Sequence, residues 1–258
     1  MMNILVVVED NRGSMHRMSK EAIAGAQKIG GNITALVIGA NADAIADQLS
    51  SIALENTLVV KHELVSSYNS DGYTEVVKQV IQSINPSIII IGHTYQTRDF
   101  MPRVSARIDI PFIPDIIEVE QDIYTKQVLN SKLNSSVSSL SDMKILSFQS
   151  ACFSAEDMLT GSSSSQNFDV DLDPSMVRSS SEEPFQESAA EVDLESAELI
   201  VSVGRGIEKE DNIPIAFTLA EVLGAEVSAS RPVIDSGWLP SFRQIGSSGS
   251  AVSPKLYF

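Results

Sequence analysis

The sequence predicts an α/β protein whose larger, N-terminal part is built on a parallel sheet. Continuous apolar runs at Ile4–Val8 and Ser87–Ile91 are typical of strands that are buried on both faces. Between them lie segments with helical periodicity, of which Tyr73–Ile84 carries its Val and Ile side chains on a single stripe. Alternating strands and helices imply a parallel sheet that is covered on both faces and joined by right-handed crossovers.

The remaining elements of this part follow in chain order. Helices are expected at Ser19–Ile29, Asp43–Leu54 and Arg98–Ile108, and strands at Ile33–Ile38 and Leu58–Lys61. The rhythm then changes to short strand candidates with polar spacers, at Ile116–Glu120, Tyr124–Leu129 and Lys144–Phe148. We expect these three strands to pair antiparallel at the edge of the domain.

A second strand–helix–strand unit follows near the C-terminal end. Strands at Glu198–Val203 and Glu226–Ala229 flank a helix that Asn212 can cap, with Pro214 in its first turn and Gly224 after its end. This helix is expected to bury one face, made by Ile215, Leu219, Val222 and Leu223. The chain therefore divides into an α/β domain at 1–153, a linker at 154–197 and a smaller α/β domain at 198–258.

The charge of the chain is strongly negative and unevenly distributed. The 258 residues carry a net charge of −16, which makes nucleic acid and anionic membranes poor partners. From Asp169 to Glu198 there are ten acidic residues and one basic residue, Arg178. The stretch from Ser154 to Glu198 is also serine-rich and poor in apolar residues. We expect it to be partly a linker, with ordering that is weak or depends on a partner.

The single cysteine, Cys152, excludes an internal disulfide and suits a reducing compartment. It is expected to be a plain buried thiol, because no histidine or basic residue stands beside it in the sequence. The first apolar run is followed at once by Glu9 and Asp10 and has no basic region before it, so it predicts a first strand rather than a signal peptide. The two acids are expected to lie in a solvated loop, with a site at the strand tip as the alternative.

Several kinds of chemistry are excluded by the spacing of residues. Gly204-Arg205-Gly206 is not a dinucleotide fingerprint, and the sequence holds no Gly-x-x-x-x-Gly-Lys phosphate loop. The three histidines, His16, His62 and His93, lack the spacing of metal ligands. Trp238 can stack on a ring or pack between domains. What remains is a set of turns that can bind a polar, partly aromatic cofactor.

The ordered set of motifs in residues 198–258 resembles the electron transfer flavoprotein alpha subunit family. The motifs are Gly-Arg-Gly from Gly204, Ser-Arg-Pro-x-x-Asp-x-Gly-Trp from Ser230, Gln-x-Gly-x-x-Gly from Gln244, and Pro-Lys-Leu-Tyr from Pro254. In the first domain, Gly92-His93-Thr94 and the segment 98–109 also resemble that family. The resemblance covers most of 1–120 and 195–258 and is weak between Gln121 and Glu195.

The resemblance implies a function and a set of partners. Members of the family hold one FAD, form a heterodimer with a beta subunit, and carry single electrons from acyl-CoA or other flavin dehydrogenases to a membrane quinone oxidoreductase. Such a protein is an electron carrier rather than an enzyme, serves fatty acid beta-oxidation, and lies in a bacterial cytoplasm or, alternatively, in the mitochondrial matrix. In this chain the beta subunit would be contacted by the domain at 1–153.

The resemblance also assigns cofactor-binding residues in the second α/β domain. They are Arg205, Ser230, Arg231, Gln244, Ile245, Gly246, Ser247 and Ser248. The family usually has Gln and Thr at the last two positions, so Ser248 keeps a hydroxyl and Ser247 loses an amide. The family's Gly-Ile-Ser-Gly segment would follow Leu256-Tyr257 and is not in this sequence. The expectation is therefore an incomplete, truncated FAD-binding domain that does not hold FAD tightly alone.

Two other interpretations stay open at this point. The strand–helix series of residues 1–150 also suits a nucleotide-binding regulatory module. Alternatively, the chain is a fragment whose first domain docks on a beta subunit while FAD is no longer bound. A mononucleotide bound without flavin favours the first of these, and a co-purifying second polypeptide without yellow colour favours the second.

Overall fold

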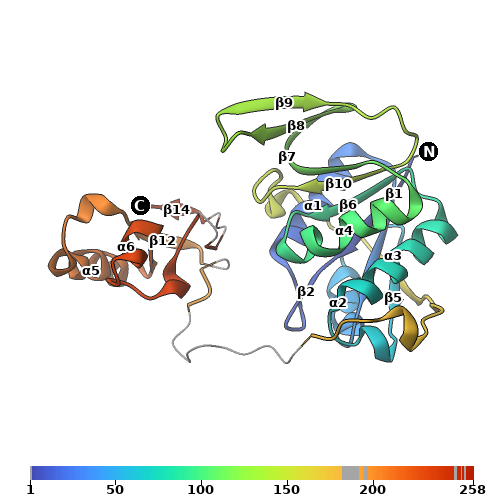
Figure 1. The fold of residues 1–258 in the computed structure, drawn as a ribbon, viewed down its shortest axis with the longest axis horizontal. Helices are drawn as coiled ribbons and strands as arrows, with labels where there is room; N and C mark the ends of the chain where they lie inside the picture. Colours follow the sequence, from blue (N-terminus) through green and yellow to red (C-terminus); the bar gives the residue numbers. More distant parts are fainter. Residues whose placement is uncertain (1, 182–191, 195–196, 247–248, 251, 253) are drawn as a thin grey trace. The chain divides into compact units, whose positions relative to one another are not determined.

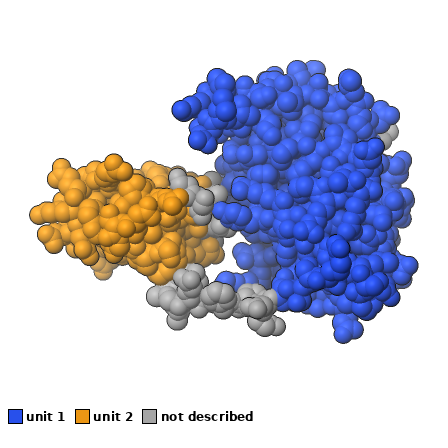
Figure 2. Space-filling model, viewed as in Figure 1, with its two compact units in different colours: residues 1–182 blue, residues 183–258 orange. Residues whose placement is uncertain are grey.

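The computed structural model describes residues 2–181, 192–194, 197–246, 249–250, 252 and 254–258. By their contacts the residues separate into two compact units, 1–182 and 183–258, which are coloured separately in Figure 2. Each unit has its own hydrophobic core.

The first unit is built on one nine-stranded sheet with the order β11-β5-β4-β1-β6-β10-β7-β8-β9 (Figure 1). The strands are β1 (Asn3–Val8), β4 (Asn32–Ile38), β5 (Asn56–Val60), β6 (Ile88–Gly92), β7 (Phe112–Glu120), β8 (Ile123–Val128), β9 (Leu133–Val137), β10 (Lys144–Phe148) and β11 (Ser164–Asn167). From β11 to β7 the neighbours pair in parallel, and β8 and β9 add an antiparallel hairpin. The predicted α/β class with a parallel sheet is confirmed.

Four helices cover the two faces of this sheet (Figure 1). Buried side chains of α1 (Arg17–Ile29) and α2 (Ala42–Leu49) share one core with every second residue of β1, β4 and β6, on one face of the sheet. Those of α3 (Ser70–Ile84) and α4 (Tyr95–Ile108) share the opposite core. Among the residues that the structure describes, no helix combines the length and apolar character needed to cross a bilayer.

Three details of this unit differ from the expectations. Lys144–Phe148 does not pair antiparallel at the edge; β10 lies inside the sheet, parallel to both β6 and β7. Helix α2 ends at Leu49 instead of Leu54, because Ile52 leaves the helix to bridge Thr160. Strands β9 and β11, whose sequences are mainly polar, were not expected at all. Both are outermost strands, so backbone hydrogen bonding rather than side-chain burial defines them.

The acidic stretch after residue 154 contributes structure to the first unit. Strand β11 extends the sheet beyond β5, and Leu172 is buried in the core that α3 covers. The buried carboxylate of Asp71 accepts hydrogen bonds from the backbone N–H of Arg178 (3.1 Å) and the guanidinium of Arg103 (3.2 Å). The part of the expected linker up to residue 181 therefore packs on the sheet domain.

The second unit repeats the architecture on a smaller scale. Its parallel sheet has the order β13-β12-β14, made by Glu226–Ala229, Leu199–Val203 and Leu256–Tyr257. Helices α5 (Ile213–Leu223) and α6 (Arg231–Asp235) complete it, and Gly224 ends α5 in the left-handed conformation, as the sequence predicted. The side chain of Asn212 does not cap α5; its amide instead donates to the carbonyl of Ile207 (2.8 Å).

The face that α5 buries is not the predicted one. The helix packs Ile213, Ala216 and Ala220 against the sheet, while Ile215 is 66% exposed and Val222 is 80% exposed. Leu219 and Leu223 lie between these faces and are half-buried. The helix is apolar nearly all round, so hydrophobicity alone could not choose between two faces. The small residues Ala216 and Ala220 let the helix approach the sheet closely.

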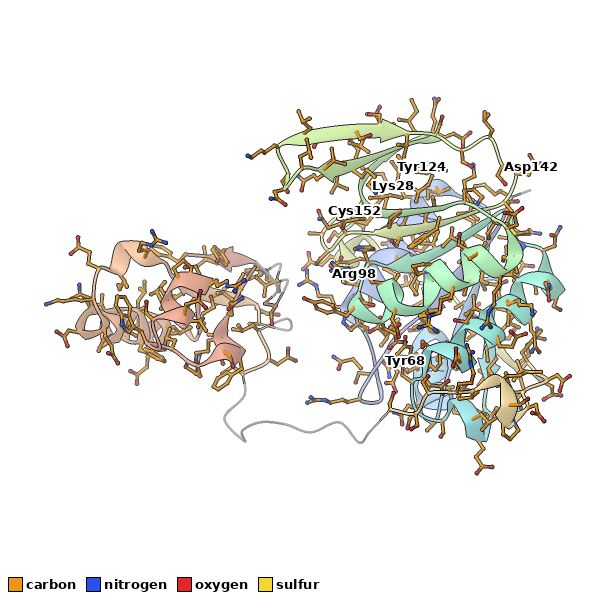
Figure 3. The ribbon with its side chains drawn as sticks, viewed as in Figure 1. Lys28, Tyr68, Arg98, Tyr124, Asp142 and Cys152 are labelled. Atoms are coloured by element: carbon orange, nitrogen blue, oxygen red, sulfur yellow. The ribbon has the colours of Figure 1, made fainter. Side chains whose placement is uncertain are left out.

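A buried carboxylate joins α1 to the loop after β10. Glu21 is almost fully buried, and its carboxylate accepts a hydrogen bond from the backbone N–H of Ala151 (2.8 Å) and lies 3.2 Å from the Arg17 guanidinium. Cys152, labelled in Figure 3, is the next residue; burial, with help from Glu21, raises the pKa of its thiol to about 12. Cys152 is half-buried rather than fully buried as expected, and its raised pKa favours a thiol that is not reactive.

Replacing Glu21 with glutamine is expected to alter the pH dependence of stability. Burial raises the pKa of Glu21 above its usual 4.5, so the folded state binds more protons than the unfolded state. Wild-type stability therefore falls as pH rises from about 4.5 through the folded pKa, and E21Q lacks this loss. Urea unfolding followed by circular dichroism at pH 4 and pH 7 measures it. A wild type that gains stability relative to E21Q between those pH values would contradict this assignment.

Candidate functional site

The sequence-predicted site residues gather at the carboxyl edge of the small sheet. Strand β12 ends at Val203 and leads into Gly204 and the short turn Arg205–Ile207, and β13 ends at Ala229 and leads into Ser230 and Arg231. Because β12 and β13 are parallel neighbours, their ends lie side by side. β13 and β14 lie on opposite sides of β12, so the strand order switches direction beside β12. Open α/β sheets bind ligands at such a switch point.

The first two turns are in direct proximity. A side-chain carbon built on Gly204 would lie 3.8 Å from the hydroxyl oxygen of Ser230, and the backbone N–H of Ser230 donates to the carbonyl of Val203 (3.0 Å). With no side chain at Gly204 or Gly206, the backbone between the strand ends is open to a ligand. The structure therefore brings Arg205, Ser230 and Arg231 to one edge.

The third predicted motif joins the same edge. Gln244 bridges Ala229 in parallel, and the backbone N–H of Ile245 donates to the carbonyl of Ala229 (2.9 Å). Gly246 has a φ of 69°, which favours glycine, and Gly249 approaches Gln244 so closely that an added Cβ would lie 2.4 Å from its carbonyl oxygen. Gln244, Ile245 and Gly246 are thus placed beside β13. Ser247 and Ser248, also predicted, lie outside the described residues.

The basic side chains at this edge are exposed. Arg231 pairs with Asp235 at 3.4 Å between Nε and Oδ2, and both side chains are more than half exposed. Lys209, Arg243 and Lys255 of this unit also have carboxylate partners. Among the described residues of the unit, Arg205 is the basic side chain without one. An unpaired guanidinium beside a glycine turn is suited to an anionic group.

A buried hydroxyl lies one residue before this edge. Ser228 is fully buried on β13, beside Ser202 of β12, and its hydroxyl has no hydrogen-bond partner among the described residues.

Trp238, the candidate for ring stacking, is half-buried and packs on the core of this unit with Val233 and Leu239. Trp238 thus serves the packing of the unit that supports the edge.

The corresponding edge of the first unit is occupied by its own side chains. Its switch point lies between β1 and β6, and there the Thr94 hydroxyl donates to the Glu9 carboxylate (2.6 Å). Glu9 is therefore neither a solvated loop residue nor free for a ligand. A carboxylate at this position opposes a phosphate, so the structure disfavours the nucleotide-binding interpretation for this edge.

His93 is held in a separate polar cluster at the same edge. Its Nδ1 lies 2.8 Å from the Ser147 hydroxyl, and Arg98, labelled in Figure 3, donates from Nε to its Nε2 (3.2 Å). Burial lowers the pKa of His93 despite the opposing effect of Asp115, whose carboxylate is 3.9 Å away. A neutral ring with both nitrogens engaged joins β6, β10 and α4.

Comparison with known proteins agrees with these two units. The electron transfer flavoprotein domain family matches residues 4–173, and the electron transfer flavoprotein FAD-binding domain family matches residues 193–258. The electron transfer flavoprotein subunit alpha of Bacillus subtilis is 31% identical over 98% of this chain and 80% of its own length. The probable mitochondrial subunit alpha of Caenorhabditis elegans is 31% identical (98% and 76%), and that of Pseudomonas aeruginosa 29% identical (99% and 82%). The chain belongs to the family of electron transfer flavoprotein alpha subunits.

Proposed function

We propose that this chain binds FAD at the carboxyl edge of β12 and β13, as the alpha subunit of a heterodimer with a beta subunit. The observation that carries the proposal is the Arg205 guanidinium, exposed and without a carboxylate partner among the described residues, beside the turn at Gly204. The residues at this edge fit the group: guanidinium groups suit its phosphates and its reduced ring, and bare glycine backbone permits close approach.

Each residue has a distinct role in this proposal. When bound, the flavin supplies a ring that can take up and release electrons one at a time. Arg205 and the open backbone at Gly204 hold negative charge at the end of β12. Arg231 would supply a positive charge to the bound ring, and a positive charge there would favour the reduced form. Ser230 and the Gln244–Gly246 turn supply hydroxyl, amide and backbone groups that orient the ring and exclude water.

Family membership supports a proposal for the route of the electrons. The relatives are electron carriers by name, and we propose that this protein accepts electrons from acyl-CoA or other flavin dehydrogenases and delivers them to a membrane quinone oxidoreductase. That route serves fatty acid beta-oxidation in a bacterial cytoplasm or in the mitochondrial matrix. The domain at 1–153 would anchor the heterodimer by contacting the beta subunit, and no substrate bond is broken in the chain itself.

Replacing Arg205 with alanine is expected to weaken FAD binding by the heterodimer at least about tenfold, because a charge-assisted contact is lost, equivalent to about 1.4 kcal/mol. Fluorescence titration of the flavin-depleted heterodimer measures the Kd. Lys209→Ala is the matched control, since it removes a neighbouring positive charge that is paired with Asp211 at 3.8 Å. Equal Kd values for both variants, or a wild-type heterodimer that takes up no FAD, would contradict the proposal.

A further inference from the structure

Helix α5 carries a second apolar face, which the described residues of its own unit leave largely exposed at Ile215 and Val222. Ile215, Leu219 and Val222 recur at the spacing of one helical stripe, opposite the buried Ile213, Ala216 and Ala220. We call these three residues the α5 outer ridge. Ile215 and Val222 are largely exposed, whereas Leu219 lies at the margin toward the buried face, is half-buried and packs partly on the core of the unit. Phe217 does not belong to the ridge, because the Arg243 guanidinium lies over its ring at 5.5 Å.

This second face is unusual for a helix at a protein surface. A surface helix has one apolar stripe and a polar opposite side, whereas a helix that is apolar all round is normally buried. In α5 only Thr218 and Glu221 are polar, and both are exposed. Contiguous exposed apolar surface of this kind marks an interaction site. Because α5 is apolar on two faces, the sequence pattern predicted the ridge residues to be buried in the core.

The charges around the ridge restrict what can cover it. Glu208, Glu210 and Asp211 precede the helix, and Glu221 lies on it; all four are exposed. Lys209 is the single basic residue in this group, and it pairs with Asp211. A second copy of this chain would bring two acidic rims together, and an anionic membrane would also be repelled. The face therefore complements a different polypeptide with an apolar centre and basic residues around it.

We propose that the α5 outer ridge docks the beta subunit, through an apolar patch bordered by lysine or arginine side chains. This inference rests on the heterodimer proposed above and adds a second contact to the one proposed for the domain at 1–153. It places a protein interface on the helix that connects β12 to β13, the two strands whose ends carry the FAD-binding residues. Docking on α5 would therefore couple assembly of the heterodimer to the position of the flavin edge.

The test is the affinity of the purified 258-residue chain for the purified beta subunit, measured by isothermal titration calorimetry. The double variant Ile215→Ser with Val222→Ser is expected to raise the Kd at least tenfold. Its fold is expected to be unchanged, because both side chains are already exposed. Glu221→Gln is expected to weaken binding less and to flatten its dependence on salt. Leu159→Ser is the matched control for the ridge and Glu156→Gln for the rim, since both residues are exposed and lie outside 1–153 and α5.

The outcomes separate this inference from the proposed function. A wild type that binds the beta subunit, with the double variant within twofold of it, overturns the assignment of the ridge but leaves the heterodimer intact. A wild type that does not bind at all overturns both. Sedimentation of the chain alone identifies other occupants of the ridge. A dimer that is lost in the double variant indicates a second copy of the chain. A monomer whose hydrodynamic radius increases in the double variant indicates that other residues of the same chain cover the ridge. Either result overturns the proposal.

Discussion

Replacing Arg231 with alanine is expected to lower the potential at which the bound flavin accepts its first electron by roughly 60 mV. A positive charge about 4 Å from the ring, at an effective dielectric near 20, is worth about 4 kcal/mol, which sets an upper bound of roughly 170 mV at about 59 mV per tenfold. Arg231 is 58% exposed and shares its charge with Asp235. Solvent and this carboxylate screen it, so the expected shift is well below the bound.

Asp235, the ion-pair partner of Arg231, supplies a control that is expected to shift the flavin potential in the opposite direction. Asp235→Asn removes the screening carboxylate and is expected to raise the potential modestly, while Arg231→Lys keeps the charge and shifts it least. Spectroelectrochemical titration of the heterodimer with FAD bound gives all three values. An unchanged potential in an Arg231→Ala variant that still holds FAD would falsify the electrostatic role.

Replacing Gly249 with alanine is expected to disrupt the turn beside β13 and to weaken FAD binding at least about tenfold. The added Cβ would lie 2.4 Å from the carbonyl oxygen of Gln244, a backbone atom that cannot move without breaking the pairing of Gln244 with Ala229. Forcing an atom into such a space costs about 1–3 kcal/mol of stability. Trp238 is the only tryptophan in the sequence and lies in this unit, so its fluorescence on heating reports the loss.

Gly206 supplies the control for Gly249. A Cβ at Gly206 would meet no atom within 4 Å, and its φ is not in the left-handed region, so Gly206→Ala should leave the Trp238 unfolding midpoint unchanged. If Gly249→Ala unfolds at the wild-type temperature and binds FAD with the wild-type Kd, the turn at Gln244 does not depend on the close approach of Gly249 and does not shape the site.

The central strands were predictable because they are buried on both faces. The outer strands were not predictable because they lack this burial. Ile88–Ile91 could be assigned because a continuous aliphatic run has few alternatives to a buried strand. Strands β9 and β11 follow no such pattern, since their pairing uses backbone groups that every residue has. The interior place of β10 was obscured by Lys144 and Ser147; both are buried through local partners, the ring of Tyr124 and the ring of His93.

The candidate site was predictable to the extent that its residues follow strand ends. Arg205, Ser230 and Arg231 come directly after β12 and β13, so a parallel pair of strands places them together. The bridge that brings Gln244 to Ala229 is a tertiary contact that no local pattern signals. The outer ridge of α5 was visible in the sequence but was assigned to the core, because a helix with two apolar faces satisfies either orientation.

The most direct test of the central claim is a crystal structure of the heterodimer of this chain and its beta subunit, reconstituted with FAD. Flavin density is expected at the carboxyl edge of β12 and β13, in contact with the guanidinium groups of Arg205 and Arg231 and with the turn at Gln244. Flavin held at the Glu9–Thr94 edge of the first unit, or entirely within the beta subunit, would contradict the account.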